Sequence, residues 1–250
     1  MNLQRISALV KMELKKIIRE PAYLFMMLLF PLVLTLSFGL GFASMPSQVP
    51  GKTQFEFMVP GLFGYACIFI IMTVAQAFSD DREQGLLKRI NVTPTTSGEF
   101  MGSNLITNTL LSVLQVALVA ISAFLMGFRA QGGVPGLVLA FLFVMILSLC
   151  SVGLGLITAT IAKSSEAATG ISFIFILPQM FFGTFIPITE ITRPIAMFLP
   201  SYYVTDAITM IFNGVALTDL NIWFDLIVVL VISLVIVIVG MGLFKRYGKA

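Results

Sequence analysis

The chain has 250 residues, of which 58% are hydrophobic and 11% charged, and its formal net charge is +3. Because ordinary soluble domains carry about 25% charged residues, this composition excludes a soluble globular protein and indicates one that is integral to a membrane. The chain has no histidine, so it lacks the usual general base and the commonest metal ligand. Its two cysteines, Cys67 and Cys150, lie inside apolar runs and predict neither a disulfide framework nor a metal site.

Residues 3–20 predict an amphipathic connecting helix on the inner membrane surface. At about 100° per residue, one narrow stripe is apolar: Leu3, Ile6, Val10, Leu14 and Ile17. The opposite arc is basic: Arg5, Lys11, Lys15, Lys16 and Arg19. A basic face above an apolar one suits an anionic leaflet, whereas flanking charge alone would explain the lysines but not the stripe. Pro21 then separates this helix, residues 1–20, from a transmembrane domain, residues 21–250.

The transmembrane domain contains apolar runs that are long enough to cross a hydrocarbon core of about 30 Å. Six runs meet this length: Pro21–Phe42, Phe57–Phe78, Ser103–Phe128, Leu137–Ala162, Ala167–Ile186 and Ile222–Phe244. The predicted fold is therefore an all-α membrane protein with six spans. An even number of spans places both termini on the same side of the membrane.

The basic residues predict which side that is. Twelve of the 15 flank the spans on the side of the termini: Arg5, Lys11, Lys15, Lys16, Arg19, Arg82, Lys88, Arg89, Lys163, Lys245, Arg246 and Lys249. Lys52, Arg129 and Arg193 lie on the other side. By the positive-inside rule, both termini are cytoplasmic and the protein is a multi-pass protein of the inner membrane. The first span is too long for a signal peptide, so we expect no cleavage there.

The loop after the second span combines apolar residues with charges. Leu86, Leu87 and Ile90 can share one face of a short helix, which Pro94 would end. Thr96 and Glu99 then have the spacing of a capping box for the next span. The apolar face favours a docking surface for another protein, but a solvated connector whose leucines rest on the bilayer fits the spacing equally well.

The segment between the fifth and sixth spans, residues 187–214, is too interrupted to cross. Pro187, Pro194 and Pro200 divide it, and the piece from Tyr202 to Asn213 reaches only about 18 Å at 1.5 Å per residue. With Ser201 as N-cap and Gly214 at the C-terminal end, this piece predicts a half-helix that enters the membrane and returns. Irregular backbone at that depth is tolerated only beside protein or a water-filled cavity, which indicates a transport path.

Polar residues inside the spans have two interpretations. They are Gln76, Asn104, Asn108, Gln115, Gln179 and Asp225. Most are expected to form hydrogen bonds between helices and a minority to contact substrate. Asp225 lies near the outer end of the last span, where we expect it to be exposed to water. The 23 Phe and 14 Met residues pack by default, although a wall rich in both would also accept varied apolar ligands.

Gly51-Lys52-Thr53 imitates the end of a phosphate-binding loop. Pro46 stands where that motif requires its first glycine, and no strand precedes it, so we predict no nucleotide site in this chain.

Two groups of motifs carry a resemblance to a known family. The first is Arg82-Glu83-x-Gly85-x-Leu87, continuing through Thr93-Pro94 to Glu99. The second is Phe182-Gly183-x-Phe185-Ile186-Pro187 with Leu199-Pro200-x-Tyr202-x-x-x-Asp206-Ala207. With these motifs, residues 3–244 resemble the permease subunit of type-2 ABC exporters, the group that includes the daunorubicin-resistance and polysaccharide or lipid exporters. The chain differs in having Gly85-Leu86-Leu87-Lys88 in place of the common Gly-Thr-Leu-Glu, and Gly98 in place of a basic residue.

The resemblance implies that residues 82–91 form a coupling helix in a groove of a separate ABC ATPase subunit. The implied coupling residues are Arg82, Glu83, Gly85, Leu86, Leu87, Lys88, Arg89, Ile90 and Pro94. It further implies a dimer of permeases with two ATPase subunits, which bind the ATP and Mg²⁺. This chain would then be no enzyme and would bind no cofactor and no nucleic acid.

The resemblance also implies that the second and fifth spans line the path and that residues 187–214 close its outer end. The implied path and gate residues are Phe69, Met72, Gln76, Gln179, Phe182, Pro187, Tyr202, Tyr203 and Asp206. The transported substrate would be hydrophobic or amphipathic. Two alternatives fit the residues less well. A secondary transporter or channel would need a carboxylate at mid-membrane and often inverted repeats, and an intramembrane enzyme would need a catalytic motif.

Overall fold

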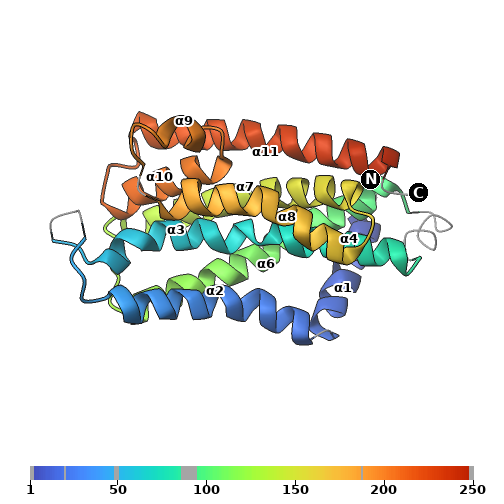
Figure 1. The fold of residues 1–250 in the computed structure, drawn as a ribbon, viewed down its shortest axis with the longest axis horizontal. Coiled ribbons are helices and arrows are strands. Elements are labelled where there is room, and N and C mark those ends of the chain that lie inside the picture. The colour runs from blue at the N-terminus through green and yellow to red at the C-terminus, as the bar shows by residue number, and fades with distance from the viewer. Residues whose placement is uncertain (1–2, 20, 48–50, 86–94, 187, 248–250) are drawn as a thin grey trace.

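The structure is a computed structural model that describes residues 3–19, 21–47, 51–85, 95–186 and 188–247. In this part of the chain every named element is a helix, as the sequence predicted. The long helices lie side by side along the long axis of the molecule, and α1 (Leu3–Arg19) crosses one end of them (Figure 1). Both chain termini lie at that end, which we call the terminal end; the other end is called the far end (Figure 1).

Five stretches are long and apolar enough to cross a membrane: residues 54–83, 98–125, 133–161, 165–185 and 220–246. They correspond to the last five predicted spans. The first predicted span forms α2 (Pro21–Phe42), of which the stretch Met27–Phe42 counts as a shorter apolar helix among the described residues. The described part of the chain therefore contains five candidate spans, and the sixth stays a prediction.

Some spanning helices begin before their predicted apolar runs, because polar residues cap their starts. The second span is two helices, α3 (Gln54–Ile68) and α4 (Ile70–Glu83), which meet at Phe69. The third span is α6 (Ser97–Leu125), the fourth is α7 (Gly133–Ile161) and the last is α11 (Leu220–Tyr247). Thr53 with Glu56 and Thr96 with Glu99 form capping boxes at the starts of α3 and α6. The second of these confirms the capping box that the spacing predicted.

The fifth span changes its helical geometry towards the far end. Pro178 lies inside α8 (Ser165–Met180), and the chain then forms a π-helix, η1 (Phe181–Phe185). Proline removes one backbone donor and leaves a carbonyl without its helical partner, and π-helical turns accommodate such interruptions. The short helices α9 (Arg193–Ala196) and α10 (Pro200–Phe212) follow at the far end (Figure 1).

The apolar stripe of α1 contacts the bundle. Ile6 and Ile17 are buried, and Ile17 clusters with Met27 of α2 and Leu111 of α6. Leu3 at the start of the stripe is 82% exposed. The helix is therefore amphipathic as predicted, and much of its apolar face covers protein. Its place on the membrane surface stays a prediction.

Aromatic side chains fill the core at both ends. At the far end, the ring of Phe212 in α10 lies 5.2 Å from those of Phe63 and Phe128. At the terminal end, the ring of Phe78 lies 4.8 Å from Phe244 and 5.6 Å from Phe100. These contacts join α4, α6 and α11 at the terminal end, and α3 and α10 at the far end.

Helices α7 and α11 cross where both have glycine. A Cβ atom at Gly240 would lie 2.5 Å from the backbone oxygen of Gly153, whereas one at Gly242 would meet no atom within 4 Å. We expect Gly240→Ala to lower the free energy of unfolding by about 1–3 kcal/mol, the usual cost of overpacking. The matched Gly242→Ala should be neutral or stabilising by up to about 1 kcal/mol, because alanine has the higher helix propensity. Unfolding of both variants in the same lipid nanodiscs measures the difference, and equal effects would contradict close packing at this crossing.

Candidate functional site

The predicted coupling segment is held in place on its N-terminal side by the ends of two spanning helices. Arg82 donates hydrogen bonds to the backbone oxygens of Ala159, at 3.1 Å, and Ala162, at 2.6 Å. These carbonyls end α7, where the helix leaves its last oxygens unpaired. Glu83 accepts a hydrogen bond of 3.0 Å from the backbone N–H of Ser165, at the start of α8. The last turn of α4 is thus bonded to both sides of the α7–α8 turn.

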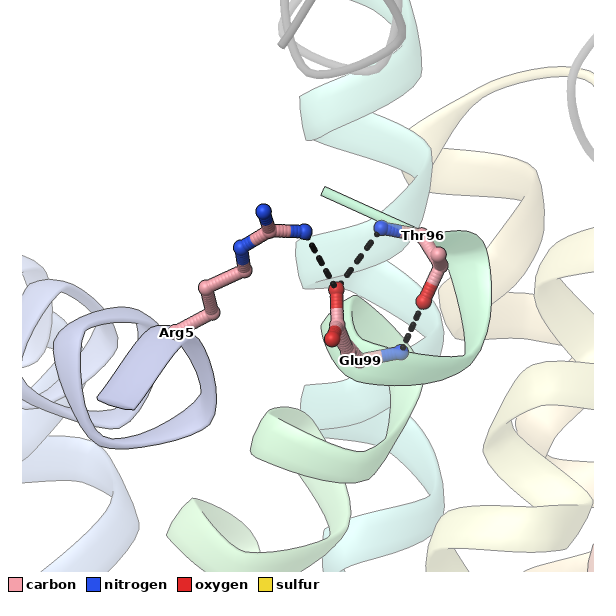
Figure 2. A network of polar contacts seen from close by, with 3 residues as sticks. All are labelled: Arg5, Thr96 and Glu99. Carbon is pink, nitrogen blue, oxygen red and sulfur yellow. Dashed lines mark hydrogen bonds and ion pairs between the residues drawn. The ribbon is translucent and has the colours of Figure 1, made fainter. Parts of the chain in front are cut away.

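The C-terminal flank of the same segment is bonded to α1. Glu99 accepts a hydrogen bond from the backbone N–H of Thr96, and Arg5 lies 3.9 Å from the same carboxylate oxygen (Figure 2). Glu99 is almost fully buried, at 2% exposure of the whole residue. Because a buried charge is costly unless it is paired and hydrogen-bonded, these contacts stabilise this arrangement.

A second ion pair joins α1 to α4. Lys16 donates a hydrogen bond of 2.7 Å to Asp81, whose side chain is 5% exposed. The segment between α4 and α6 is therefore flanked by Asp81, Arg82 and Glu83 on one side and by Glu99 on the other. These four side chains bond to α1, α7 and α8. The sequence analysis did not predict the partners of these side chains, because the bonded residues lie far apart along the chain.

Six of the nine predicted coupling residues lie outside the described part of the chain: Leu86, Leu87, Lys88, Arg89, Ile90 and Pro94. Gly85 is described and has a φ of +71°, which glycine adopts without the steric cost that other residues pay. It follows Gln84, the C-cap of α4, and so occupies the position where a helix end favours glycine.

At the far end, η1 and α10 approach each other closely. A Cβ atom at Gly183 would overlap Ser201 Oγ and lie 2.9 Å from Ser201 Cβ. Ser201 donates a hydrogen bond of 3.2 Å to the backbone oxygen of Gln179. The prediction that Ser201 is the N-cap was wrong, since Leu199 occupies that position and Pro200 begins the helix. Proline fits the first helical turn because its missing N–H would have no helical partner there.

The C-terminal end of α10 agrees with the sequence. Gly214 has a φ of +78°, and the N–H of Val215 bonds to the oxygen of Met210 at 3.1 Å. Helix α10 is only 13 residues long, and its last residue, Phe212, accepts a hydrogen bond from the N–H of Gln131 in the α6–α7 connection. Helix α10 therefore begins beside Gln179, to which Ser201 bonds, and ends at the far end of the bundle.

Some of the predicted gate residues line a cavity at the far end, and others lie outside it. Tyr202 and Asp206 line a cavity of about 190 Å³ between η1, α10 and Phe57 of α3. Tyr203 and Phe182 are not among its lining residues; the hydroxyl of Tyr203 donates to the oxygen of Met197 at 2.9 Å. Pro187 lies outside the described residues. Sequence analysis missed Thr184, Thr205 and Thr209, which also line the cavity.

The other predicted path residues lie along α4 and α8. Gln76 donates a hydrogen bond of 2.7 Å to Thr169 of α8, as expected for a polar residue between helices. The Phe69 ring lies 5.2 Å from Phe30 of α2, and Met72 packs on the apolar cluster around Ile68 and Ile176. Gln179 is 2% exposed. These residues connect the two ends of the bundle, but the described cavities do not place them in one continuous channel.

The expectation for Asp225 was wrong. The residue lies in the second turn of α11, as the sequence placed it, but it is only 5% exposed. The hydropathy pattern does not report this burial. No group of three or more Cys, Asp or Glu side chains that could hold a metal occurs in the described ranges.

Comparison with known proteins assigns residues 4–213 to the ABC-2 type transporter family. The match runs from α1 through α10 and covers more than half of the chain. The daunorubicin resistance ABC transporter permease protein DrrB1 of Streptomyces coeruleorubidus is 24% identical over 165 residues, which are 66% of this chain and 56% of that protein. The chain thus spans just over half the length of this relative. The all-helical fold, the five candidate spans and the family match agree, and the chain therefore belongs to the ABC-2 type transporter family, as a multi-pass membrane subunit.

Proposed function

We propose that this chain is the permease subunit of an ATP-driven exporter of hydrophobic or amphipathic substrates. It would act as a dimer with two separate ABC ATPase subunits, which bind the ATP and Mg²⁺. The terminal end would face the cytoplasm and receive the ATPases, and the far end would face outward. The family match, the name of the relative and the distribution of basic residues support this proposal.

One observation carries the mechanism. The flanks of the segment between α4 and α6 are bonded to α1, α7 and α8 through Asp81, Arg82, Glu83 and Glu99. A connector needs only to span the gap between two helices, whereas a coupling element must transmit displacement to the helices around it. A push on this segment would move the ends of five helices together, because packed and hydrogen-bonded elements shift as units. This favours docking over the connector interpretation that the sequence left open.

Transport would then proceed by a change between two arrangements of the bundle. Closure of the ATPase dimer would displace the coupling segment, and the α7–α8 turn would follow through Arg82 and Glu83. Helix α8 continues into η1, which contacts α10 at Gly183. The proposed outer gate is therefore connected to the terminal end by a single spanning helix.

The test removes the apolar face of the coupling segment. Replacing Leu87 and Ile90 together by serine should release the ATPase or uncouple it, because each fully buried aliphatic side chain contributes about 1.5–3 kcal/mol. The permease should still insert and dimerise, since no span is changed. Co-purification of the ATPase and ATP-driven transport measure the effect.

Charge reversal at Lys88 and Arg89 is the matched comparison for the double serine variant. It should act more weakly and lose its effect at high salt, as expected of charges at the rim of an interface. Full transport and normal co-purification with the double serine variant would contradict a coupling role. Transport by the purified chain without any ATPase would instead favour a secondary transporter or channel.

A further inference from the structure

The connection between α2 and α3 contacts the C-terminal end of α10. Lys52 in this connection donates a hydrogen bond from its Nζ to Oδ1 of Asn213, the C-cap residue of α10. The C-terminal end of a helix carries a partial negative charge, so the ammonium group is attracted by the helix dipole as well as by the amide oxygen. Neither residue belongs to the motifs that carry the family resemblance. We call the contact between Lys52 and Asn213 the outer latch.

The position of Lys52 is fixed by the backbone around it. The N–H of Ser47 bonds to the backbone oxygen of Lys52 at 3.1 Å. The N–H of Gln54 bonds to the backbone oxygen of Met45 at 2.8 Å, and Thr53 caps the start of α3. Lys52 is therefore joined to the end of α2 and to the first turn of α3, so that the latch couples the position of α3 to that of α10.

The latch lies one helical turn beyond the far-end cavity on two of its walls. Phe57 of α3 and Thr209 of α10 both line this cavity. The N–H of Phe57 bonds to the oxygen of Thr53, and the N–H of Asn213 bonds to the oxygen of Thr209, so each lining residue is one turn from its end of the helix. Helix α3 begins and α10 ends at the far end (Figure 1). The latch therefore joins the two walls on the outer side of the cavity and opposes their separation.

The contact between the same two helices also contains a polar group that is not satisfied. Oγ1 of Thr205, which lines the cavity, is buried and has no hydrogen-bond partner among the described residues. A Cβ atom at Gly64 of α3 would lie 3.3 Å from this oxygen, so the hydroxyl lies against α3 at a close approach. A buried hydroxyl without a partner is costly, and separation of α10 from α3 would expose it to water. The buried hydroxyl thus favours opening, whereas the latch favours the closed arrangement.

We propose that Lys52 is a positioning residue of the outer gate. Its bond to the C-terminal end of α10 holds this helix against α3, and the bond breaks when the gate opens. The balance between the closed and open arrangements is then set by two opposed contributions, the loss of the latch and the hydration of Thr205. The inference rests on the proposed function, because it assigns a control to the outer gate of that transport path.

The accessibility of position 205 measures opening without a transported substrate. Thr205→Cys replaces the buried hydroxyl by a thiol, and the full chain in phosphatidylcholine nanodiscs is labelled with a polyethylene glycol maleimide. This reagent is uncharged, so that loss of the Lys52 charge does not change its rate of encounter. The labelling rate is divided by that of Thr218→Cys, an exposed position in the connection between α10 and α11. The chain without an added cysteine gives the background from Cys67 and Cys150, which are both buried.

Removal of the latch should increase labelling at position 205. Lys52→Met keeps the aliphatic stem and should raise the labelling ratio about threefold to tenfold, the factor that an exposed hydrogen bond from a charged donor contributes. Asn213→Ala should raise it by a similar factor. The double variant should label no faster than either single variant, because both substitutions remove the same bond. Lys52→Arg keeps the charge and the donors, and its ratio should stay within about twofold of that of the parent chain.

Arg129→Met is the matched control, because this far-end basic side chain bonds to the end of α6. It should leave the labelling ratio unchanged. An unchanged ratio in Lys52→Met, an equal rise in Arg129→Met, or additive rises in the double variant would each overturn the inference. If Thr205→Cys does not fold, Thr209→Cys in the same cavity is the reporter. Since the labelling uses neither ATP nor ATPase, its failure is distinct from a failure of the coupling experiment.

Discussion

Replacing Arg82 by methionine is expected to reduce ATP-driven transport at least tenfold while the ATPase still co-purifies. The Arg82 guanidinium is bonded to the backbone oxygens of Ala159 and Ala162, and hydrogen bonds to a charged group contribute about 1.5–3 kcal/mol each. Methionine keeps the aliphatic stem and removes the donors. The coupling segment would then move without the α7–α8 turn. Transport into inverted membrane vesicles, compared with ATP hydrolysis by the same sample, measures the uncoupling.

Arg129→Met is the matched control at the far end. Arg129 donates hydrogen bonds to the backbone oxygens of Phe124, at 3.1 Å, and Phe128, at 3.0 Å, so it caps the end of α6 as Arg82 caps the end of α7. The substitution removes the same guanidinium donors from a helix end that lies away from the coupling segment. Transport should stay at more than half of the unmodified level. Equal losses in the two variants would show that Arg82 only stabilises a helix end.

Gly183→Val is expected to abolish transport by displacing α10 from η1. A side chain at this position meets Ser201, whose hydroxyl is bonded to Gln179, and overpacking costs typically about 1–3 kcal/mol. Gly170→Val, in the same span, is the control because a Cβ atom there meets no atom within 4 Å. The test compares transport by the two variants at equal amounts of protein in the membrane, and it shows whether the contact between η1 and α10 is needed for transport. Normal transport by Gly183→Val would mean that this contact is not part of the gate.

The sequence predicted the helices well where a local signal determines them. The hydropathy of the last five spans, the capping box of Thr96 and Glu99, and the helix end at Gly214 depend on residues close together in the chain. The start of the third span was predicted six residues too late, because the apolar run begins after the polar cap, whereas its other end was predicted three residues too far along the chain. The break at Phe69 carried no proline or glycine signal and was missed.

Contacts between distant residues could not be predicted in the same way. The partners of Arg82 lie 77 and 80 residues away in the sequence, and those of Asp81 and Glu83 lie 65 and 82 residues away. Motif spacing marked Arg82 and Glu83 as coupling residues without showing what they bond to. Asp225 was misjudged for a related reason, because the pattern of the sequence identifies an apolar or polar face but not which neighbour covers it.

Docking of the ATPase at the terminal end can be measured directly by site-specific cross-linking. A photoreactive amino acid is placed at Leu87, in the coupling segment, or at Met45, which is 50% exposed near the far end. Each variant is expressed with the ATPase subunit and irradiated in membranes. We predict capture of the ATPase from position 87 and none from position 45. Capture from position 45, or none from position 87 in a sample that still transports, would contradict the proposed arrangement.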